Sequence, residues 1–178
     1  MCGCSARSAA APAAGTVTSE SRTARVVIAS TRASSGVYED RCGPIISQWL
    51  VQQGFPEPGI DVVADGDPVG QALRSAIEKR VDLVITSGGT GLSPTDATPA
   101  QTVAVLDYEV PGLADAIRRS GLPKVPTAVL SRGVCGVAGR TLVVNLPGSP
   151  GGVRDGLSVL TDVVHHALDQ LAGEDHRR

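Results

Sequence analysis

The residues best suited to chemistry lie in one stretch, 86–99, which reads TSGGTGLSPTDATP. Its three glycines let the backbone adopt positive φ and approach a ligand closely, and its hydroxyl groups are small neutral donors. Thr98 before Pro99 predicts a helix start, with the Thr98 hydroxyl as the cap and proline at the first helical position, where no N–H is needed. Because the N–H groups at a helix start attract anions, the stretch predicts a phosphate-binding loop.

The stretch matches neither of the two common phosphate-loop patterns. The GxxxxGK[ST] loop needs a lysine after its last glycine, which is missing here, and GxGxxG needs a third glycine where Pro94 stands. A glycine-rich turn that only reverses the chain stays an alternative, because most short glycine clusters are turns. The length of the stretch favours a ligand loop, since about two to six residues are enough to join a strand to a helix.

Three aspartates, Asp65, Asp67 and Asp96, could hold a cation near such a phosphate. With no lysine in the loop, a metal would have to neutralise much of the phosphate charge, and carboxylate oxygens are ligands that Mg²⁺ prefers. For Asp67, which precedes a proline, we favour a helix-cap role. On spacing alone, Asp65 is as well explained as a turn residue, and Asp96 could be a turn or capping residue.

Short apolar, β-branched runs predict the strands that position these residues. The runs span 25–30, 60–64, 81–86, 127–131 and 140–145. Helical spacing of apolar residues follows the first three, with Trp49 predicted as a core anchor, and this alternation favours buried parallel strands covered by helices. Ser30, Asp65 and Ser87 then fall at strand carboxyl ends, the edge at which open α/β sheets bind ligands.

The last third of the chain predicts a different pairing. The runs 127–131 and 140–145 are close enough to form an antiparallel hairpin, so the sheet is predicted to be mixed. The segment LPGSPGG, 146–152, is a second glycine-rich connection, and it opens one last helix in which apolar residues from Val153 to Leu171 keep steps of three and four. The predicted fold is a three-layer α/β/α sandwich with a mostly parallel sheet and an antiparallel hairpin at one side.

Composition limits the function classes. A chain of 178 residues with 42% hydrophobic composition predicts one domain with a sizeable core, and a net charge of −2 with 2% aromatic residues gives no reason to expect nucleic acid. No apolar run is long enough to predict a membrane span. Residues 1–23 predict a disordered tail, 24–172 the domain and 173–178 a second tail. Cys2 and Cys4 lack the second pair that a zinc site needs, and the isolated Cys42 and Cys135 favour a reducing cytoplasm.

Three segments taken together resemble the molybdopterin-binding MoaB/Mog family. They are SGGTG with DATP in 87–99, SSGVYED at 34–40 and NLPGSP at 145–150. The segments AVLSR at 128–132 and EVPG at 109–112 are also similar to family segments, and the resemblance covers roughly residues 24–172. Any one of these motifs would be weak evidence, whereas the set is specific.

The resemblance implies a three-layer α/β domain, usually a homotrimer, which in the Mog branch transfers AMP from Mg²⁺-ATP to molybdopterin before another protein inserts molybdate. Family roles carry over by position to the cradle at 88–91, to the acidic Asp65 and Asp96, and to a second ligand loop at 145–149. The ligand-binding residues so implied, with Ser30 and Ser87 from the strand ends, are Ser30, Ser87, Gly88, Gly89, Thr90, Gly91, Thr98, Asn145, Pro147, Gly148 and Ser149. Asp65 and Asp96 are the implied catalytic and Mg²⁺-holding residues.

The chain departs from the family at two positions. Thr95 and Ala100 stand where members often have an arginine and an acidic residue, which puts a charge-clamping role for that arginine in doubt. AMP transfer needs no protein nucleophile, since it depends on positioning and charge neutralisation. A non-catalytic molybdopterin-binding or scaffold protein of the same family is the alternative function. A nucleotide-binding domain unrelated to molybdenum is a third.

Overall fold

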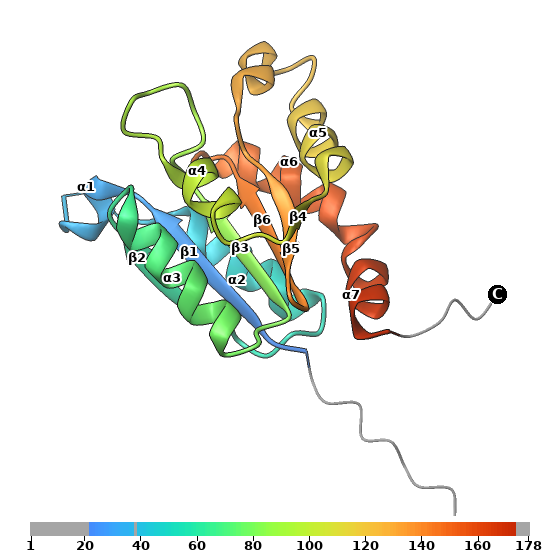
Figure 1. The fold of residues 1–178 in the computed structure, drawn as a ribbon. Helices are drawn as coiled ribbons and strands as arrows, with labels where there is room; N and C mark the ends of the chain where they lie inside the picture. The colour runs from blue at the N-terminus through green and yellow to red at the C-terminus, as the bar shows by residue number, and fades with distance from the viewer. Residues whose placement is uncertain (1–21, 38, 174–178) are drawn as a thin grey trace, which may run out of the picture.

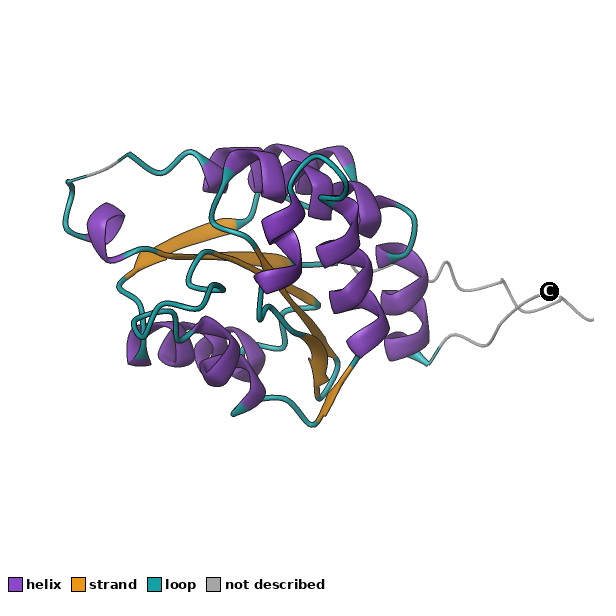
Figure 2. Ribbon diagram, turned by 90° about the horizontal axis from the view of Figure 1, so that it is seen from above, coloured by secondary structure: helices purple, strands orange, loops and turns teal. Residues whose placement is uncertain are grey.

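The computed structural model describes residues 22–37 and 39–173. Within them, six strands form one sheet in the order β2-β1-β3-β6-β5-β4, with helices on both faces (Figures 1 and 2). The strands are β1 (Ala24–Ala29), β2 (Gly59–Val63), β3 (Leu83–Ser87), β4 (Tyr108–Glu109), β5 (Cys135–Ala138) and β6 (Thr141–Leu146). The helices are α1 (Thr31–Ser34), α2 (Cys42–Gln52), α3 (Asp67–Glu78), α4 (Thr98–Val103), α5 (Pro111–Ser120), α6 (Pro150–Thr161), α7 (Val164–Ala172) and the 3₁₀ helix η1 (Pro126–Leu130).

The sheet is mostly parallel. β1 pairs in parallel with β2 and β3, and β3 with β6, whereas β5 is antiparallel to both β6 and β4. The predicted three-layer sandwich with an antiparallel hairpin at one side is confirmed. The β1, β3 and β6 strands carry apolar side chains on both faces, which is the pattern of strands buried between two helical layers.

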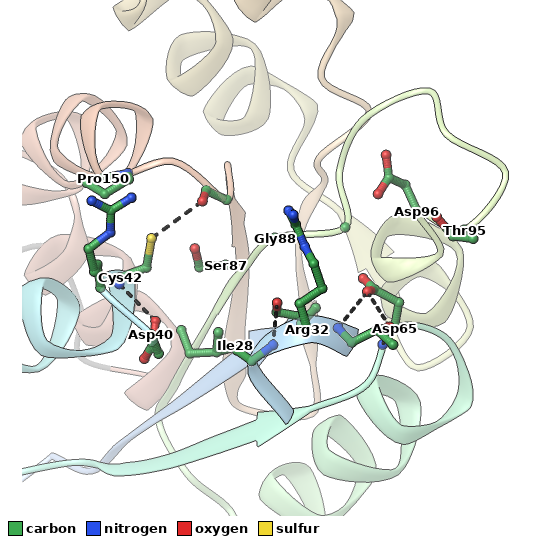
Figure 3. A pocket seen from close by; sticks show the side chains of 17 residues that line it. Ile28, Arg32, Asp40, Cys42, Asp65, Ser87, Gly88, Thr95, Asp96 and Pro150 are labelled. Carbon is green, nitrogen blue, oxygen red and sulfur yellow. Dashed lines mark hydrogen bonds between the residues drawn. The ribbon is translucent and has the colours of Figure 1, made fainter. Parts of the chain in front are cut away.

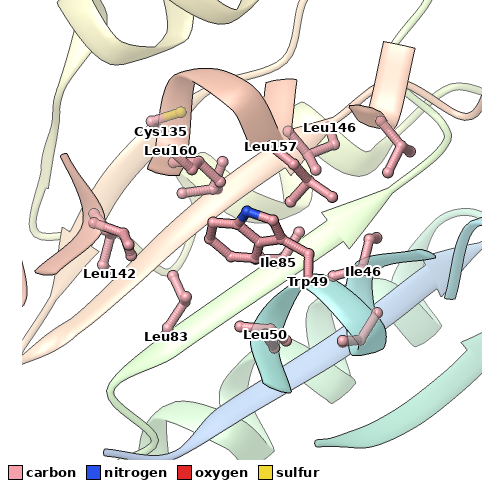
Figure 4. Packing of buried hydrophobic residues seen from close by; sticks show 14 of the residues in the cluster. Ile46, Trp49, Leu50, Leu83, Ile85, Cys135, Leu142, Leu146, Leu157 and Leu160 are labelled. Carbon is pink, nitrogen blue, oxygen red and sulfur yellow. The ribbon is translucent and has the colours of Figure 1, made fainter. Parts of the chain in front are cut away.

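The larger helical layer holds most of the core. Side chains from α2, α5, α6 and α7 pack with Val26, Ile28 and Ile85 of the sheet (Figure 4). Trp49 lies at the centre of the part drawn there and is 9% exposed, and its indole Nε1 donates a hydrogen bond to Thr161 Oγ1 at 2.9 Å. The predicted core role of Trp49 is confirmed, and the indole N–H finds the partner that a buried tryptophan needs.

The opposite layer is smaller. Alternate residues of the same strands, Val27, Val84 and Val143, pack against α3 through Val69 and Leu73. This alternation follows from the two-residue period of a strand, which sends neighbouring side chains to opposite faces. The unequal layers leave the carboxyl edge of the parallel strands covered mainly by loops.

Two predictions about the last third of the chain are wrong. The strand predicted at 127–131 does not form: these residues lie in η1 and just after it, and Pro126 at its start lacks the N–H that a strand ladder uses. The strand that pairs with β6 is β5, in the glycine-rich run that follows. Gly136 is required there, since a Cβ would lie 2.5 Å from the Tyr108 carbonyl oxygen. The single last helix is two helices, α6 and α7, which the β-branched Val163 separates at φ −128°.

The described chain begins just before β1. Thr23 donates from its backbone N–H to Asp82 Oδ2 at 2.7 Å, and Arg22 forms an ion pair with Asp169. The rest of the predicted N-terminal tail, residues 1–21 with Cys2 and Cys4, and residues 174–178 lie outside the described residues. In the part of the chain that the structure describes, no helix is both long and apolar enough to cross a membrane.

Candidate active site

A pocket of about 470 Å³ opens at the carboxyl edge of the parallel strands (Figure 3). Ile28, Ser30 and Ser87 mark the ends of β1 and β3 at its floor. The residues that line it are Ile28, Ala29, Ser30, Thr31, Arg32, Ala33, Asp40, Arg41, Cys42, Asp65, Ser87, Gly88, Gly89, Thr95, Asp96, Gly148 and Pro150. The predicted edge is therefore the one that holds the cavity.

Asp65 lies on one side of the pocket, and its orientation is fixed by Thr31. The Thr31 backbone N–H and hydroxyl donate to Asp65 Oδ2 at 3.1 and 3.0 Å, and the Asp65 N–H donates back to Thr31 Oγ1 at 3.3 Å. The other carboxylate oxygen, Oδ1, lies 2.8 Å from where a Cβ would stand on Gly89. The carboxylate thus lies beside the glycines of the loop after β3.

Asp96 reaches the same side from the long loop, the name we use for residues 88–97 between β3 and α4. Its Oδ2 accepts a hydrogen bond from the Ser93 N–H at 3.2 Å, and its own N–H donates to the Ser93 carbonyl at 3.0 Å. Figure 3 shows Asp96 and Asp65 on the same side, with Thr95 beside Asp96. Two carboxylates far apart in the sequence are therefore brought to one wall.

The two glycines after β3 are required by the backbone. Gly88 has φ 99° and Gly89 φ 61°, and a Cβ on Gly88 would overlap the Ala29 carbonyl oxygen of β1. The Gly88 N–H donates to the Leu146 carbonyl at 3.2 Å, so this amide is used within the fold. These glycines let the loop cross close over the strand ends, which is what a site for a large ligand needs.

The opposite side of the pocket comes from the start of α2 and from the short loop, residues 147–149. Asp40 caps α2, since its Oδ1 accepts from the Cys42 N–H at 2.8 Å, and the Cys42 thiol contacts the Gly148 carbonyl at 3.6 Å. Burial raises the pKa of the Cys42 thiol, so the neutral form lines the pocket. Arg41 adds a positive charge on this side.

Arg32 lies between the two sides in Figure 3. It comes from α1, a single turn that Ser30 caps by accepting the Ala33 N–H at 3.2 Å. Together with Arg41 it gives the pocket two guanidinium groups beside three carboxylates, those of Asp40, Asp65 and Asp96. A site of this composition suits a ligand that carries several negative charges along with a divalent cation.

Seven of the predicted site residues line the pocket and six do not. Ser30, Asp65, Ser87, Gly88, Gly89, Asp96 and Gly148 line it, whereas Thr90, Gly91, Thr98, Asn145, Pro147 and Ser149 lie outside the lining. Pro147 accepts the Ser87 hydroxyl at 2.8 Å, and Ser149 caps α6 by accepting the Gly152 N–H at 3.1 Å. These two residues hold the short loop in place.

Asn145 lies inside the fold. Its side-chain amide donates to Thr86 Oγ1 and Thr102 Oγ1, each at 3.0 Å, and its Oδ1 accepts from the Val134 N–H at 3.2 Å. The residue is 3% exposed. Its polar groups are thus satisfied by β3, α4 and the start of β5, and the structure places it as a connector beneath the site.

The two predicted helix caps are wrong. The residue that caps α4 is Ala97, so Thr98 is the first helical residue. Its N–H donates to the Gly89 carbonyl at 3.2 Å, and its hydroxyl is buried with no hydrogen-bond partner in the described chain. For α3 the cap is Gly66, whose φ of 94° suits glycine, so Asp67 falls in the first turn and accepts from Gln101. Pro99 and Pro68 are therefore the second residues of their helices, one position later than caps at Thr98 and Asp67 would place them.

The sequence reasoning missed four charged or thiol residues that line the pocket, Arg32, Asp40, Arg41 and Cys42. A signal was available for two of them. Cys42 opens the helix that follows the first strand, so Cys42 and the neighbouring Asp40 could have been placed at the carboxyl edge of the sheet. Arg32 and Arg41 gave no signal, because an arginine in a polar loop is usually solvated.

A divalent cation fits the acidic side only with help from a substrate. Among residues 22–37 and 39–173, no three His, Cys, Asp or Glu side chains are grouped closely enough to hold a metal ion. Mg²⁺ in nucleotide sites usually takes one or two carboxylates, with substrate phosphate and water completing its octahedron. Asp65 and Asp96 on one wall match that donor set.

Comparison with known proteins agrees with this geometry. The protein family described as "Probable molybdopterin binding domain" matches residues 25–166. The chain belongs to this family. The matched residues include every strand and the whole pocket lining, so membership in the family covers the site as well as the sheet.

Individual members of the family are similar over most of their length. The molybdopterin adenylyltransferase of Helicobacter pylori (strain J99) is 37% identical over 152 residues, which are 83% of this chain and 86% of that protein. The molybdopterin adenylyltransferase of Escherichia coli (strain K12) is 37% identical over 151 residues, 80% of this chain and 77% of that protein. The structure of the molybdopterin biosynthesis Mog protein from Mycobacterium ulcerans has 74% identity and a TM-score of 0.83, and the match covers 85% of this chain and 99% of that one.

Proposed function

We propose that the protein is a molybdopterin adenylyltransferase of molybdenum cofactor biosynthesis. It would transfer AMP from ATP to molybdopterin, giving adenylylated molybdopterin and pyrophosphate. The observation that carries the proposal is the pocket itself, in which two close glycines, the carboxylates Asp65 and Asp96 and the guanidinium groups of Arg32 and Arg41 meet at one sheet edge. The names of the Helicobacter pylori and Escherichia coli relatives support it.

The reaction joins two anions. A terminal phosphate oxygen of molybdopterin attacks the α-phosphorus of ATP, a new P–O bond forms, and the bond from that phosphorus to the bridging oxygen breaks to release pyrophosphate. No protein nucleophile is needed, and catalysis consists of alignment and charge neutralisation. In the pocket, Arg32 and Arg41 would bind phosphate oxygens, and the bare backbone at Gly88 and Gly89 would let the ligand lie against the strand ends.

The carboxylates have a different role. Asp65 and Asp96 would hold Mg²⁺ that arrives with the nucleotide, and Mg²⁺ when bound neutralises phosphate charge and polarises the α-phosphorus. Thr31 keeps Asp65 in one rotamer through its two hydrogen bonds, so the position of this carboxylate is preorganised. Preorganisation of this kind lowers the cost of bringing the two anions together.

The test uses carboxylate variants with a matched control. Single-turnover formation of adenylylated molybdopterin and equilibrium molybdopterin binding are measured for Asp65→Asn, Asp96→Asn and Asp67→Asn. The first two should lose on the order of a hundredfold in turnover and much less in binding, because the charge matters most in the transition state. Asp67 is exposed, lies outside the pocket and should behave like the parent. Normal turnover in both site variants would remove these carboxylates from the mechanism.

The same assay separates the enzyme from the scaffold alternative. Molybdopterin binding without pyrophosphate release, in the parent protein with Mg²⁺ and ATP present, would favour a non-catalytic binding protein. We also expect a cytoplasmic enzyme that delivers its product to a molybdate-insertion protein. The cytoplasmic location and the molybdate-insertion partner both rest on the family resemblance. The partner also follows from the product, because an adenylylated pterin is an activated intermediate that a further reaction must use.

We propose a homotrimer as the assembly. Four exposed apolar side chains, Leu122, Val125, Val129 and Leu130, lie close together in the sequence between α5 and β5 and would be covered by a neighbouring subunit. Light scattering in dilute solution gives the mass directly. A monomer throughout the micromolar range would contradict the trimer and leave the site chemistry untouched.

A further inference from the structure

The long loop carries Asp96 into the pocket, yet its own residues give it little support. Its internal hydrogen bonds are local ones: the Asp96 N–H donates to the Ser93 carbonyl at 3.0 Å, the Ser93 N–H to Asp96 Oδ2 at 3.2 Å and the Thr95 N–H to Ser93 Oγ at 3.4 Å, and the hydroxyls of Ser93 and Thr95 bond at 2.9 Å. Residues 92–95 are exposed to solvent. A loop with local bonds and an exposed tip has no intrinsic reason to hold one position, so its anchors to the rest of the fold decide where Asp96 lies.

The long loop is tied to distant segments at two places. At its start the Gly88 N–H donates to the Leu146 carbonyl at 3.2 Å, and further along three hydrogen bonds come from Arg132. The Arg132 backbone N–H donates to the Thr90 carbonyl at 2.8 Å, its Nε to the Gly91 carbonyl at 2.7 Å and its Nη2 to the Asp96 carbonyl. The guanidinium thus joins Gly91 to Asp96 and closes the neck of the loop between them, a geometry that a forked, planar donor can satisfy and a single ammonium group cannot.

Arg132 is itself held by the core. The Gly133 carbonyl next to it accepts from Arg118 Nη1 at 2.8 Å, and the Val134 N–H donates to Asn145 Oδ1 at 3.2 Å. Asn145 is joined in turn to β3 and α4 through Thr86 and Thr102. Hydrogen bonds to Arg118 and to the buried Asn145 therefore hold the two residues that follow Arg132 in the chain, which gives the Arg132 backbone a fixed base from which its side chain holds the loop.

We propose that Arg132 is a positioning residue for the reaction: it closes the neck of the long loop and thereby sets the place of the Asp96 carboxylate in the pocket. It does not line the pocket and touches no substrate, so it acts through Asp96. The role in catalysis rests on the proposed function, whereas the closing of the loop does not. Arg132 is solvent-exposed, so its removal should leave the core intact.

A double-mutant cycle tests the catalytic part. Arg132→Ala should lower kcat for adenylylation by on the order of tenfold or more, with smaller changes in KM, because hydrogen bonds from a charged donor are among the stronger ones. In the Asp96→Asn background the same substitution should cause little further loss, since the two residues act as one unit. A loss in that background as large as in the parent overturns the proposal, as does a parent-like kcat in Arg132→Ala.

Two further variants make the result specific. Arg132→Lys keeps the charge and should recover only part of kcat. Full recovery would disprove the claim that a forked guanidinium is required. The same variant replaces Arg132→Ala if that protein does not fold. Arg119→Ala is the control, because Arg119 is 74% exposed in its side chain and pairs only with Asp115 on the surface of α5 among the described residues. It should keep the parent kcat and melting temperature.

Hydrogen exchange without substrate tests the closing of the loop by itself. The amides of Ser93 and Asp96 should exchange about tenfold faster or more in Arg132→Ala than in Arg119→Ala, because the bonds that hold the loop closed are lost. Equal exchange in the two variants overturns the proposal. If the parent protein releases no pyrophosphate, the proposed function fails, and this exchange measurement still decides the role of Arg132.

Discussion

The short loop supplies the cap of the helix that follows it, whereas the long loop supplies no side-chain cap and takes its anchors from elsewhere in the chain. In the short loop Ser149 caps α6, and the Pro147 carbonyl accepts the hydroxyl of the neighbouring strand end. In the long loop α4 begins without a side-chain cap, the Thr98 hydroxyl is left without a partner, and Arg132 supplies the anchors. The two loops are in contact at Gly148 and Gly88, since a Cβ added to Gly148 would lie 3.1 Å from the Gly88 Cα.

The comparison teaches which part of the site is built locally. The wall made by the short loop and α2 has a hydrogen-bond acceptor within a few residues of each helix start, so it should be stiffer and more tolerant of changes elsewhere. The wall that carries Asp65 and Asp96 is assembled from β2, the long loop and the segment after η1, so a change at any of them should reach the carboxylates. The predictions below test this difference.

The largest expected effect is that of Gly88→Ala compared with Gly148→Ala. Gly88 has φ 99°, and its new Cβ would overlap a β1 carbonyl that cannot move, so we expect a loss of about 3 kcal/mol in unfolding free energy. Gly148 needs no positive φ and would meet only a Cα at 3.1 Å, so its loss should stay below about 1 kcal/mol. Urea unfolding measures both. Equal losses would mean that the long loop is no more constrained than the short one.

The next effect is that of Asn145→Ala. This change leaves the Thr86 and Thr102 hydroxyls and the Val134 N–H without their buried partner, so we expect a loss of about 2 kcal/mol, since each unsatisfied buried group is costly. Gln101→Ala is the matched amide control, because the Gln101 side chain donates its hydrogen bond to the exposed Asp67 of α3, at 3.0 Å. An Asn145→Ala protein as stable as Gln101→Ala would refute a connector role and return Asn145 to the list of ligand candidates.

The difference between the loops also explains what the sequence could predict. Strand ends at Ser30 and Ser87 and the start of α6 at Pro150 follow from signals within a few residues, namely β-branched runs, a serine and a proline. The sheet edge that holds the pocket could be predicted for the same reason, because parallel strands place their carboxyl ends together. Local patterns were therefore enough for the fold class, and seven of the seventeen residues that line the pocket were predicted.

The errors arise where a long-range contact decides the local structure. The run Cys135–Ala138 has two small residues and no strong β pattern, yet it forms β5 because β4 and β6 lie on either side of it. The family resemblance places Asn145 in a ligand loop, and only the fold shows Thr86 and Thr102 beside its amide. No spacing rule relates Arg132 to Gly91, 41 positions away.

A smaller effect distinguishes the two helix starts. Ser149→Ala removes the hydrogen bond to the Gly152 N–H and should cost about 1 kcal/mol, the usual value of an N-cap. Thr98→Val replaces a buried hydroxyl without a partner by a methyl group of nearly the same shape, so stability should stay the same or rise by up to about 1 kcal/mol. Thermal unfolding compares the pair. A clear loss in Thr98→Val would show that this hydroxyl is hydrogen-bonded in solution.

The smallest effect concerns the Cys42 thiol, which reports on the short loop. Burial raises its pKa, so at pH 8 less of it is thiolate than in a free cysteine, and its alkylation should be slow and should speed up as the pH rises toward that pKa. Cys135 gives an internal reference, because burial raises its pKa to about 12 and its alkylation should be slower still. Mass spectrometry of the peptides that carry each cysteine measures the two rates separately.

The two loops should then differ in their influence on Cys42. Arg132→Ala opens the neck of the long loop, which does not cover the thiol, so the alkylation rate of Cys42 should not change. Ser149→Ala loosens the short loop, whose Gly148 carbonyl contacts the Cys42 Sγ at 3.6 Å, so the rate should rise severalfold. If Arg132→Ala raised the alkylation rate of Cys42 as much as Ser149→Ala, the two walls of the pocket would move together. The short loop would then be no stiffer than the rest of the site.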